Sequence, residues 1–390
     1  MQIQYIFFAL KNIFYFPWNY THIIDEQRED SRCLFVDISD TFRNDTGTGI
    51  PRVSKNVIAS LHEKNLAYTI VEIYTRVAPV GFYNCKTKKP IRVKKGDIFL
   101  FLEPARYAIA GNKLLLDKLY RYGIPLYFFV HDLLPLCYPQ YFPKRSVIGF
   151  RWWMKIIINY TGLIANSKST LDEIKQYIEE HPSLPKNKNI QTTYVHLGSV
   201  FSQKPLPVPS AADGIEKIAL LAVSTVEPRK RYDQIVGACE LLWEKGIDMQ
   251  LTIVGKPGWK NKTTIARIRS SPYLNHKLFW YDSYISDAEL NALYENCSAL
   301  IFASEGEGFG LAIMEAAAYN KPLILRDIPI FREVSGDGAF FFNGFTCAEL
   351  ADALETWITS YKDGVAPLPH VRFTTWKECT DNILQILGIE

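Results

Sequence analysis

The chain has 390 residues, of which 48% are hydrophobic and 22% are charged. This composition excludes a disordered chain, and at roughly 150 residues per domain the length predicts two or three domains. The formal net charge of +3 is too small a bias to indicate a nucleic-acid-binding protein.

The seven cysteines stand singly along the chain, without a CxxC pair. They predict neither a disulfide framework nor a zinc site, and they fit a reducing compartment. No stretch reaches the ~18 apolar residues that a membrane span requires. Residues 1–30 form an N-terminal extension that lacks the basic start of a secretory signal. We expect a cytoplasmic protein, with this extension either at a membrane interface or packed on the fold.

In the first half, short apolar runs rich in β-branched and aromatic residues alternate with helical patterns. We expect strands at residues 34–39, 68–75, 97–103, 125–132, 162–167 and 193–198. After the first of them, TGTGIPRV (46–53) contains Gly47 and Gly49, and an apolar stripe from Ile50 to Leu61 predicts a helix. The GxG here lacks the third glycine of the dinucleotide fingerprint, which argues against a nicotinamide enzyme.

His131 and Asp132 end the fourth of these strands. A histidine beside an acid at the carboxyl end of a strand is a candidate for contacting a bound sugar, and a purely structural histidine is the alternative. No GxSxG elbow accompanies the pair, so a serine nucleophile is not indicated.

The helical segment at residues 142–158 is basic and aromatic. Such a composition suits the surface of an anionic membrane, and the alternative is a partly buried helix whose cations reach out to solvent. Its residues of interest are Lys144, Arg145, Phe150, Arg151, Trp152, Trp153 and Lys155.

Residues 201–216 contain alternating prolines, which cannot sit in a helix or a central strand and therefore predict a linker. In the second half we expect strands at residues 218–225, 250–256, 278–283, 299–304, 322–327 and 339–342.

Near-continuous apolar strands separated by amphipathic segments predict parallel sheets covered by helices on both faces. We therefore predict two doubly wound α/β domains, residues 31–200 and 217–373, on either side of the linker. Ligands of such sheets bind beyond the carboxyl ends of the strands, so we expect the site in a cleft between the two.

The strand at 218–225 is followed by the sequence EPRKR, which places Arg229, Lys230 and Arg231 at its carboxyl end. Clustered cations in this position suit a diphosphate, with lysine acting as a point charge and arginine as a fork. The alternative is a solvated basic start of a helix.

The stretch SEGEGFGLAIMEAAAYNKPLIL, residues 304–325, is the most informative. Its three glycines predict a flexible turn and a helix that begins at about Leu311. Backbone N–H groups at such a helix start form an anion cradle. Glu307 and Glu315 bracket this cradle and are better placed to bind sugar hydroxyls than phosphate. A glycine turn with a carboxylate near the helix dipole is the alternative.

At these residues the chain resembles the retaining nucleotide-sugar glycosyltransferases of family 4, which have the GT-B fold. The resemblance spans residues 33–385, and its combination of motifs is similar to the bacterial polysaccharide branch, notably O-antigen mannosyl- and rhamnosyltransferases. The motifs that carry it are TGTGIPRV (46–53), HD (131–132), EPRK (227–230), VGKPGW (254–259), EGFGLAIME (307–315) and RDIPIFREV (326–334).

The resemblance implies a role for each candidate residue. Lys230, with Arg229, would bind the donor diphosphate, and Glu315 would hold the nucleotide ribose. Glu307 would bind hydroxyls of the transferred sugar, and His131 would contact the sugar near the reacting carbon. The backbone at Gly49, Phe309, Gly310 and Leu311 would approach the sugar and phosphate.

One position departs from the family pattern. Many relatives carry a second phosphate-binding arginine where this chain has Ser224, and we expect Arg229 to substitute for it. The resemblance also implies that the last segment, residues 374–390, forms a helix that crosses back to the first domain.

The resemblance further implies transfer with retention, with no metal ion and no cofactor beyond the nucleotide-sugar donor. We expect GDP-mannose as donor and an oligosaccharide or lipid-linked acceptor, with an anionic membrane surface as a further partner. A rhamnosyl- or glucosyltransferase that uses a dTDP- or UDP-sugar is the alternative. From another class, a sugar-nucleotide epimerase or an inactive binding partner stays open.

Overall fold

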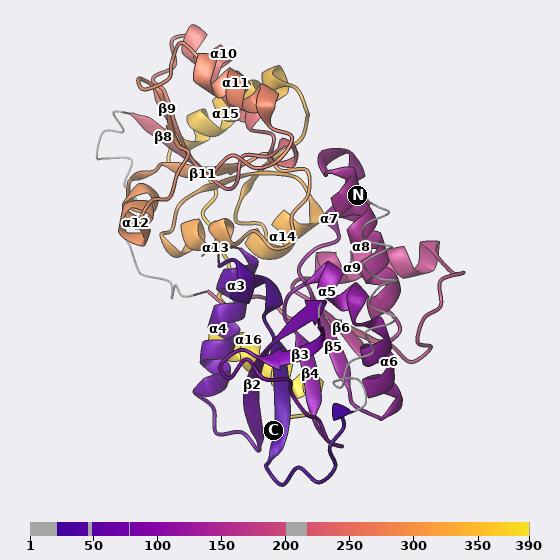
Figure 1. The fold of residues 1–390 in the computed structure, drawn as a ribbon. Coiled ribbons are helices and arrows are strands. Elements are labelled where there is room, and N and C mark those ends of the chain that lie inside the picture. Colours follow the sequence, from indigo (N-terminus) through magenta and orange to yellow (C-terminus); the bar gives the residue numbers. More distant parts are fainter. Residues whose placement is uncertain (1–21, 46–48, 78, 200–216, 390) are drawn as a thin grey trace. The chain divides into compact units, whose positions relative to one another are not determined.

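The computed structural model describes residues 22–45, 49–77, 79–199 and 217–389 (Figure 1). The expected linker at 201–216, Gly47 and most of the expected N-terminal extension lie outside these residues. The chain divides by its contacts into two compact units. The first contains the chain up to Leu136, residues 145–198 and the segment from Trp376 onward, and the second contains residues 137–144 and 199–375.

The first unit is built on a seven-stranded sheet with the order β3-β2-β1-β4-β5-β6-β7. Every strand pair is parallel except β2 with β3, which corrects the expectation of a purely parallel sheet. Only two residues separate β2 from β3, and a parallel crossover needs a dozen or more. The strands are β1 (Arg32–Asp37), β2 (Tyr68–Val77), β3 (Val80–Asn84), β4 (Ile98–Phe101), β5 (Leu126–Val130), β6 (Gly162–Ala165) and β7 (Gln191–Tyr194).

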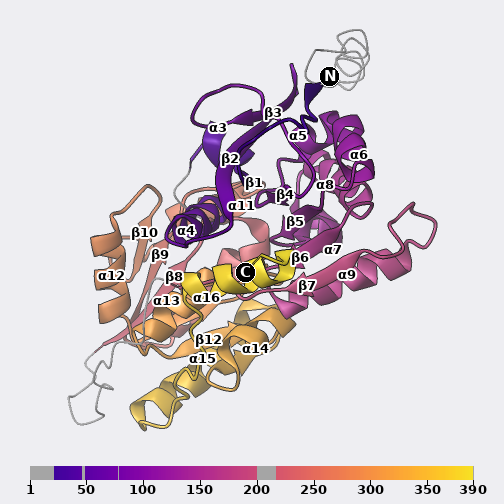
Figure 2. The same ribbon diagram turned by 90° about the horizontal axis from the view of Figure 1, so that it is seen from below.

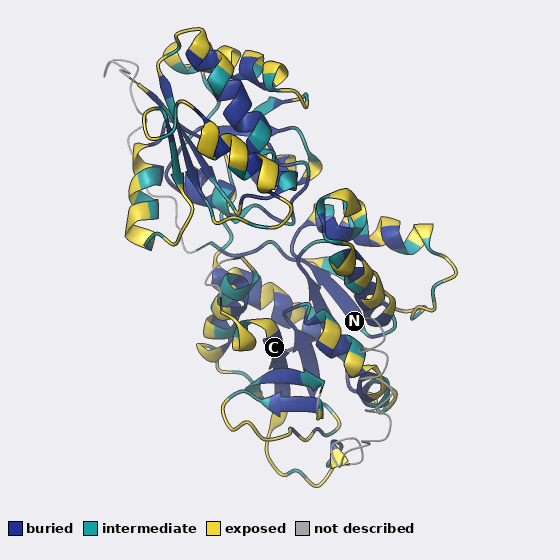
Figure 3. Cartoon of the chain, turned by 45° about the horizontal axis from the view of Figure 1, so that its top comes forward, coloured by how far each residue is buried: buried dark blue, intermediate teal, exposed yellow. Residues whose placement is uncertain are grey.

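Helices cover both faces of this sheet, and their outer surfaces are exposed while the strands β4, β5 and β6 are buried (Figure 3). The predicted helix after the first strand is confirmed as α4, with Val53, Val57 and Leu61 in its buried stripe. The helices are α3 (Ser39–Arg43), α4 (Ile50–His62), α5 (Arg106–Gly111), α6 (Lys113–Arg121), α7 (Leu134–Cys137), α8 (Lys144–Ile157), α9 (Lys168–Glu180) and α16 (Trp376–Leu387).

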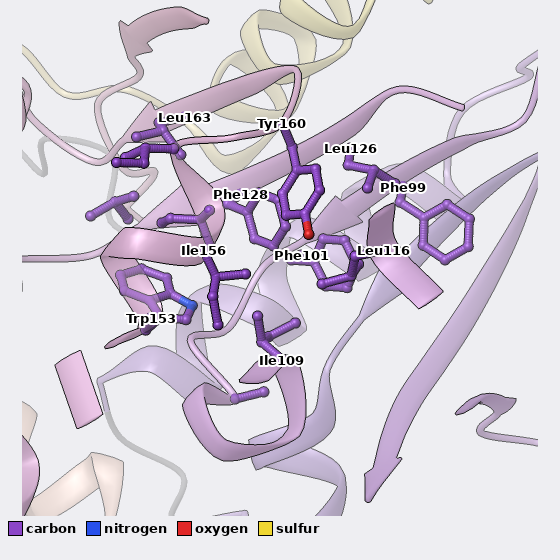
Figure 4. Packing of buried hydrophobic residues seen from close by; sticks show 14 of the residues in the cluster. Phe99, Phe101, Ile109, Leu116, Leu126, Phe128, Trp153, Ile156, Tyr160 and Leu163 are labelled. Carbon is purple, nitrogen blue, oxygen red and sulfur yellow. The ribbon is translucent and has the colours of Figure 1, made fainter. Parts of the chain in front are cut away.

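Aromatic side chains fill the core on one face of the first sheet (Figure 4). Phe101 and Phe128, from the neighbouring strands β4 and β5, stack with their ring centroids 4.5 Å apart. Tyr160 is buried beside them and donates from its hydroxyl to Asp117 Oδ1 at 2.9 Å, so its polar atom is satisfied. A core of large rigid rings fixes the central strands, whose carboxyl ends carry the candidate residues.

The second unit contains a six-stranded, fully parallel sheet with the order β10-β9-β8-β11-β12-β13. Its strands are β8 (Ile218–Val223), β9 (Met249–Val254), β10 (Leu278–Tyr281), β11 (Ala299–Phe302), β12 (Leu323–Arg326) and β13 (Phe340–Phe342). Its helices are the short 3₁₀ helices η1 (Pro139–Tyr141) and η3 (Pro228–Lys230), with α10 (Tyr232–Glu244), α11 (Lys262–Ser270), α12 (Asp287–Asn296), α13 (Leu311–Ala318), α14 (Pro329–Ser335) and α15 (Cys347–Lys362).

Each sheet has a topological switch point, where the chain leaves the centre in one direction and later returns on the other side. It lies between β1 and β4 in the first unit and between β8 and β11 in the second. Both units are therefore doubly wound α/β structures, as predicted. Loops at the carboxyl ends of strands that flank a switch point diverge, and this divergence leaves room for a ligand.

The last helix, α16, belongs to the first unit although 177 residues of the second precede it, from 199 to 375. It packs on α4 (Figure 2), and Lys64 forms an ion pair with Asp381. Gly198 lies so close to Trp376 that a Cβ at this position would come within 2.5 Å of the Trp376 backbone. The first unit is therefore completed by a contact between segments that lie far apart in the sequence.

Residues 137–144 group with the second unit, which differs from the expected continuous domain over residues 31–200. The indole of Trp259 donates to the Tyr141 carbonyl at 2.9 Å, and the Lys260 ammonium donates to the Gln140 carbonyl at 2.9 Å. Phe142 packs against Trp259, with ring centroids 5.4 Å apart.

Over the residues that the structure describes, no helix has the length and apolar character that a membrane crossing requires.

Candidate active site

The first element of the site is η3, which follows β8 at the switch point of the second sheet. Pro228 opens this short helix, where its missing N–H is not needed. Arg229 and Lys230 are both buried although each carries a charge. Arg231 then adopts a positive φ of 54°, which turns the chain into α10. The sequence thus places two cations inward at the carboxyl end of a central strand.

The second element is the glycine-rich loop after β11, the neighbour of β8 in the sheet. Its backbone is joined to η3, because the Glu305 N–H donates to the Arg229 carbonyl at 3.0 Å. The Arg229 guanidinium in turn donates to the Gly306 carbonyl. The two most informative motifs, 77 residues apart in the chain, therefore form a single structure.

Glu307 is the centre of the charge cluster. Its Oε1 accepts from the Lys230 ammonium, and its Oε2 lies 3.0 Å from Arg229 Nη1. Glu227 completes the cluster, since its Oε1 accepts from Arg229 Nη2 at 2.7 Å. All four side chains are at least nine-tenths buried. Two cations thus face two carboxylates, and burial is tolerated because each charge has an opposite partner.

The cluster keeps Glu307 ionised. Burial alone would raise the pKa of this carboxyl, but the adjacent Arg229 and Lys230 outweigh burial and bring the pKa of Glu307 to about 2. Burial also lowers the pKa of the Lys230 ammonium, an effect that Glu307 opposes. An ammonium has three N–H donors, and Glu307 takes one of them. Two remain that can donate to the oxygens of an anion.

The helix α13 begins at Leu311, as the sequence predicts. Its N-cap is Gly310, whose φ of 88° is in the left-handed region that favours glycine. Glycine has no side chain to cap the first amides of the helix, so this terminus suits an anion. Phe309, just before it, is buried. The chain thus turns into α13 at Gly310, within the segment where the cradle is predicted.

Glu315 lies one turn inside α13 and is buried. Its Oε2 accepts a hydrogen bond from the Tyr294 hydroxyl of α12 at 2.8 Å. Tyr294 is fully buried, so it holds the carboxylate in one orientation. Sequence reasoning missed Tyr294, because a tyrosine on the apolar side of a helix gives no signal that distinguishes it from other core residues.

Arg231 does not join Arg229 and Lys230, although all three cations were expected to suit a diphosphate. Its Nη1 donates to Glu305 Oε1 at 2.6 Å, and its Nε lies 3.3 Å from Asp233 Oδ1. The positive φ at Arg231 reverses the direction of the chain and takes its side chain to a different pair of carboxylates. The structure therefore buries Arg229 and Lys230 together, whereas Arg231 forms separate ion pairs.

Ser224, where many relatives have an arginine, forms a hydrogen bond with the Tyr232 hydroxyl at 2.8 Å. Arg229 nevertheless lies beside Lys230, with its guanidinium against Glu307. A second cation is therefore present in this part of the second unit, supplied from a different position in the chain.

His131 and Gly49 belong to the first unit. His131 is 6% exposed, and its Nε2 lies 2.7 Å from the Leu102 carbonyl oxygen, so this nitrogen carries the proton. Burial lowers the pKa of His131 to about 4. The ring is therefore neutral at physiological pH, and its Nδ1 is the nitrogen that can accept a hydrogen bond. Gly49 is the N-cap of α4 and has a positive φ of 58°.

The basic aromatic segment forms α8, whose aromatic residues divide between the core and the solvent. Phe150 and Trp153 are buried and pack against each other in the core of the first unit. Trp152 is 63% exposed, and Ile148 is exposed beside it. The cations Lys144, Arg145, Arg151 and Lys155 are all exposed as well.

Comparison with known proteins shows what each part of the chain is similar to. Residues 211–365 match the family described as Glycosyl transferases group 1, and residues 58–177 match the Glucosyltransferase 3-like, N-terminal domain. A serotype-specific mannosyltransferase, WbdA of Escherichia coli, is 32% identical over 389 residues, which are 93% of this chain and 46% of WbdA. The O-antigen chain mannosyltransferase RfbU of Salmonella typhimurium is 24% identical over 66% of this chain and 67% of its own. The chain thus spans about half the length of WbdA.

Solved structures with the same architecture include sucrose-phosphate synthase from Thermosynechococcus elongatus, with a TM-score of 0.63 and 14% identity over 92% of this chain and 98% of that one. Anabaena HepE in complex with UDP and glucose has a TM-score of 0.56 and 14% identity over 91% of this chain and 95% of that one. The fold is therefore GT-B, as predicted. Within this class, residues 211–365 form a domain that matches the group 1 glycosyltransferases.

Proposed function

We propose that the protein is a retaining hexosyltransferase that moves mannose from GDP-mannose to a growing polysaccharide. The observation that carries the proposal is the buried contact of Glu307 with Lys230 and Arg229 beside the start of α13. Two similar proteins, WbdA and RfbU, are mannosyltransferases, and this supports the choice of sugar. The HepE complex with UDP and glucose supports a nucleotide-sugar as the class of donor.

The donor diphosphate lies against Lys230, Arg229 and the amides of residues 309–311 in this proposal. Negative charge develops on the phosphate oxygens as the bond to the anomeric carbon breaks. Buried cations and oriented amides stabilise that charge without reorganising, and such contacts contribute more in a buried site than in water. The same cations take the place of a metal ion, and we propose that none is required.

Glu307 and Glu315 hold different parts of the donor. Glu307 accepts hydrogen bonds from hydroxyls of the transferred sugar, and Glu315, oriented by Tyr294, accepts from the ribose. His131 accepts through Nδ1 from a hydroxyl near the reacting carbon, since its Nε2–H is committed to Leu102. A neutral histidine suits this role better than that of an acid.

We propose that the retaining transfer forms no covalent intermediate, because the nearby carboxylate is a weak nucleophile. Both oxygens of Glu307 are engaged by cations and its pKa is about 2, so it attacks carbon poorly. The acceptor hydroxyl oxygen instead bonds to the anomeric carbon on the face from which the nucleoside diphosphate departs. The hydroxyl proton passes to a phosphate oxygen of the leaving group, which balances the step.

A donor panel tests this proposal. The chain is incubated with GDP-mannose, UDP-glucose or dTDP-rhamnose and a mannose oligosaccharide, and the elongated product is examined by mass spectrometry and NMR. We expect elongation from GDP-mannose, with an α-linked product, and a raised melting temperature with that donor. Elongation only from UDP-glucose or dTDP-rhamnose would refute mannose as the sugar, and donor hydrolysis or epimerisation without elongation would refute transfer.

A further inference from the structure

A pocket lies in the first unit, at the carboxyl ends of the strands around its switch point. The cavity has a volume of about 420 Å³ and is lined by Arg43, Arg76, Val77, Tyr107 and Ala108. These residues come from α3, which follows β1, from the end of β2, and from α5, which follows β4. Switch-point geometry favours a ligand site here for the same reason as in the second unit.

The charge of the lining is positive. It includes two arginines and no carboxylate. Arg43 lies 3.7 Å from Asp40, but both side chains are about half exposed, so solvent screens this pair. Among the described residues, no carboxylate lies within 4.0 Å of the Arg76 guanidinium, which lies over the Tyr83 ring at 5.1 Å. Two arginines thus line a cavity whose lining includes no carboxylate.

Further cations surround the pocket. Arg145 of α8 donates from Nε to the Tyr107 hydroxyl at 3.1 Å, and so carries positive charge to one of the lining residues. Arg106, the neighbour of Tyr107, donates from Nη1 to the Ser146 carbonyl at 3.2 Å. The pocket therefore has a positive wall built from several elements of one unit.

Hydrogen bonds fix the Arg76 backbone and the Arg43 side chain. The amide of Asn112, which is fully buried, donates to the Arg76 carbonyl at 2.7 Å and to the Ala108 carbonyl at 2.9 Å. It therefore ties β2 to α5. The Arg43 guanidinium donates to the Thr75 carbonyl and ties α3 to the same strand.

The start of α3 is fixed separately. The buried carboxylate of Glu103 accepts from the backbone N–H groups of Asp40 at 2.6 Å and Thr41 at 2.9 Å. These are the unpaired amides at the beginning of a helix, and a carboxylate there is also favoured by the helix dipole. The arginines of the pocket are therefore presented by a rigid frame, which reduces the ordering that binding requires.

We propose that this pocket binds a phosphate or diphosphate group carried by the acceptor. Arginine forks match phosphate oxygens with paired hydrogen bonds, and two of them supply more donors than one carboxylate can accept. The donor diphosphate is assigned to the second unit, so an anion here belongs to the other substrate. This inference rests on the proposed function for its assignment to the acceptor, whereas the binding of phosphate itself does not.

Calorimetric titration of the full chain with inorganic pyrophosphate, in the presence of GDP, tests the site. Arg76→Gln and Arg43→Gln should each weaken pyrophosphate binding about tenfold or more, as expected for loss of a charge-assisted hydrogen bond. Arg76→Lys, which keeps the charge but not the fork, should lie between wild type and Arg76→Gln. Arg121→Gln, at the exposed end of α6, is the matched control and should bind like wild type.

Equal pyrophosphate affinity in wild type, Arg43→Gln and Arg76→Gln would overturn the proposal. Competition then identifies the source of the group: mannose 1-phosphate represents a soluble phosphorylated acceptor, and farnesyl diphosphate a lipid-linked one. Displacement of pyrophosphate by either supports the assignment, and displacement by neither overturns it. A chain that transfers no sugar but loses pyrophosphate binding in the arginine variants would refute the proposed function and retain this site.

Discussion

Replacing Glu307 by glutamine is the most direct test of the candidate active site. The change preserves shape and removes one negative charge from a cluster in which Arg229 and Lys230 balance Glu227 and Glu307. The cluster then carries a net charge of +1 instead of zero. Glutamine can still accept from Lys230 through its amide oxygen, so the geometry of η3 should persist.

Two effects follow from this change, one on stability and one on catalysis. Removing one partner of a buried ion pair destabilises a protein by about 3–5 kcal/mol, and the retained hydrogen bond places this variant at the lower end, at about 3 kcal/mol. The barrier to catalysis should rise by a comparable amount, because a polar contact that strengthens in the transition state contributes roughly 10²–10³-fold to kcat, or about 2.7–4 kcal/mol. Binding of nucleoside diphosphate should be retained or become tighter, since the cluster becomes more positive.

Chemical denaturation comes first, to show that the variant folds at the assay temperature. Steady-state transfer then gives kcat, and calorimetry gives the affinity for GDP. Glu305→Gln is the matched control, because Glu305 is two residues away and pairs with Arg231 instead. A folded Glu307→Gln enzyme with the wild-type kcat would refute the assignment of this residue to the transferred sugar.

Three further outcomes are expected. Tyr294→Phe removes the hydrogen bond that orients Glu315 and should weaken GDP binding about tenfold with little change in kcat, and unchanged affinity in calorimetry would contradict this. The pKa of His131 is about 4 in the folded chain and about 6.5 unfolded, so the unfolded state binds more protons between these values and stability falls as the pH drops. In urea denaturation, the free energy of unfolding should fall by about 3 kcal/mol from pH 7 to 4 in the wild type, and this fall should be absent in His131→Gln. Equal pH dependence in the two proteins would refute the reasoning. Arg151→Gln with Lys155→Gln should reduce sedimentation with anionic vesicles but not with neutral ones, and an unchanged difference between the two vesicle types would contradict a membrane contact by the exposed face of α8.

Much of the fold could be predicted because its signals are local. The strands β4 and β5 are continuous apolar runs buried at every residue, and the α4 stripe and the glycine before α13 mark their helices directly. The strand β3 escaped prediction, since a five-residue edge strand after a two-residue connection has little pattern of its own.

The site could be predicted only in part, for a related reason. Motif spacing brought Lys230 and Glu307 to neighbouring strand ends, but their direct pairing depends on the order of strands in the sheet. The ion pairs of Arg231 depend on one backbone angle, and the arginine pocket depends on three separate elements. Such contacts belong to the tertiary structure, and no single stretch of sequence encodes them.

The return of α16 to the first unit has a consequence for biosynthesis. A ribosome makes the first unit's seven strands and then the whole second unit before the helix that packs on α4 emerges. The partners Lys64 and Asp381 are 317 residues apart, so their meeting closes a very long loop. The entropic cost of closing such a loop grows only slowly, roughly as the logarithm of its length. This cost is much smaller if the intervening second unit has already folded. We therefore expect the second unit to complete its folding first during synthesis, and the first unit to complete its folding only after α16 has been made.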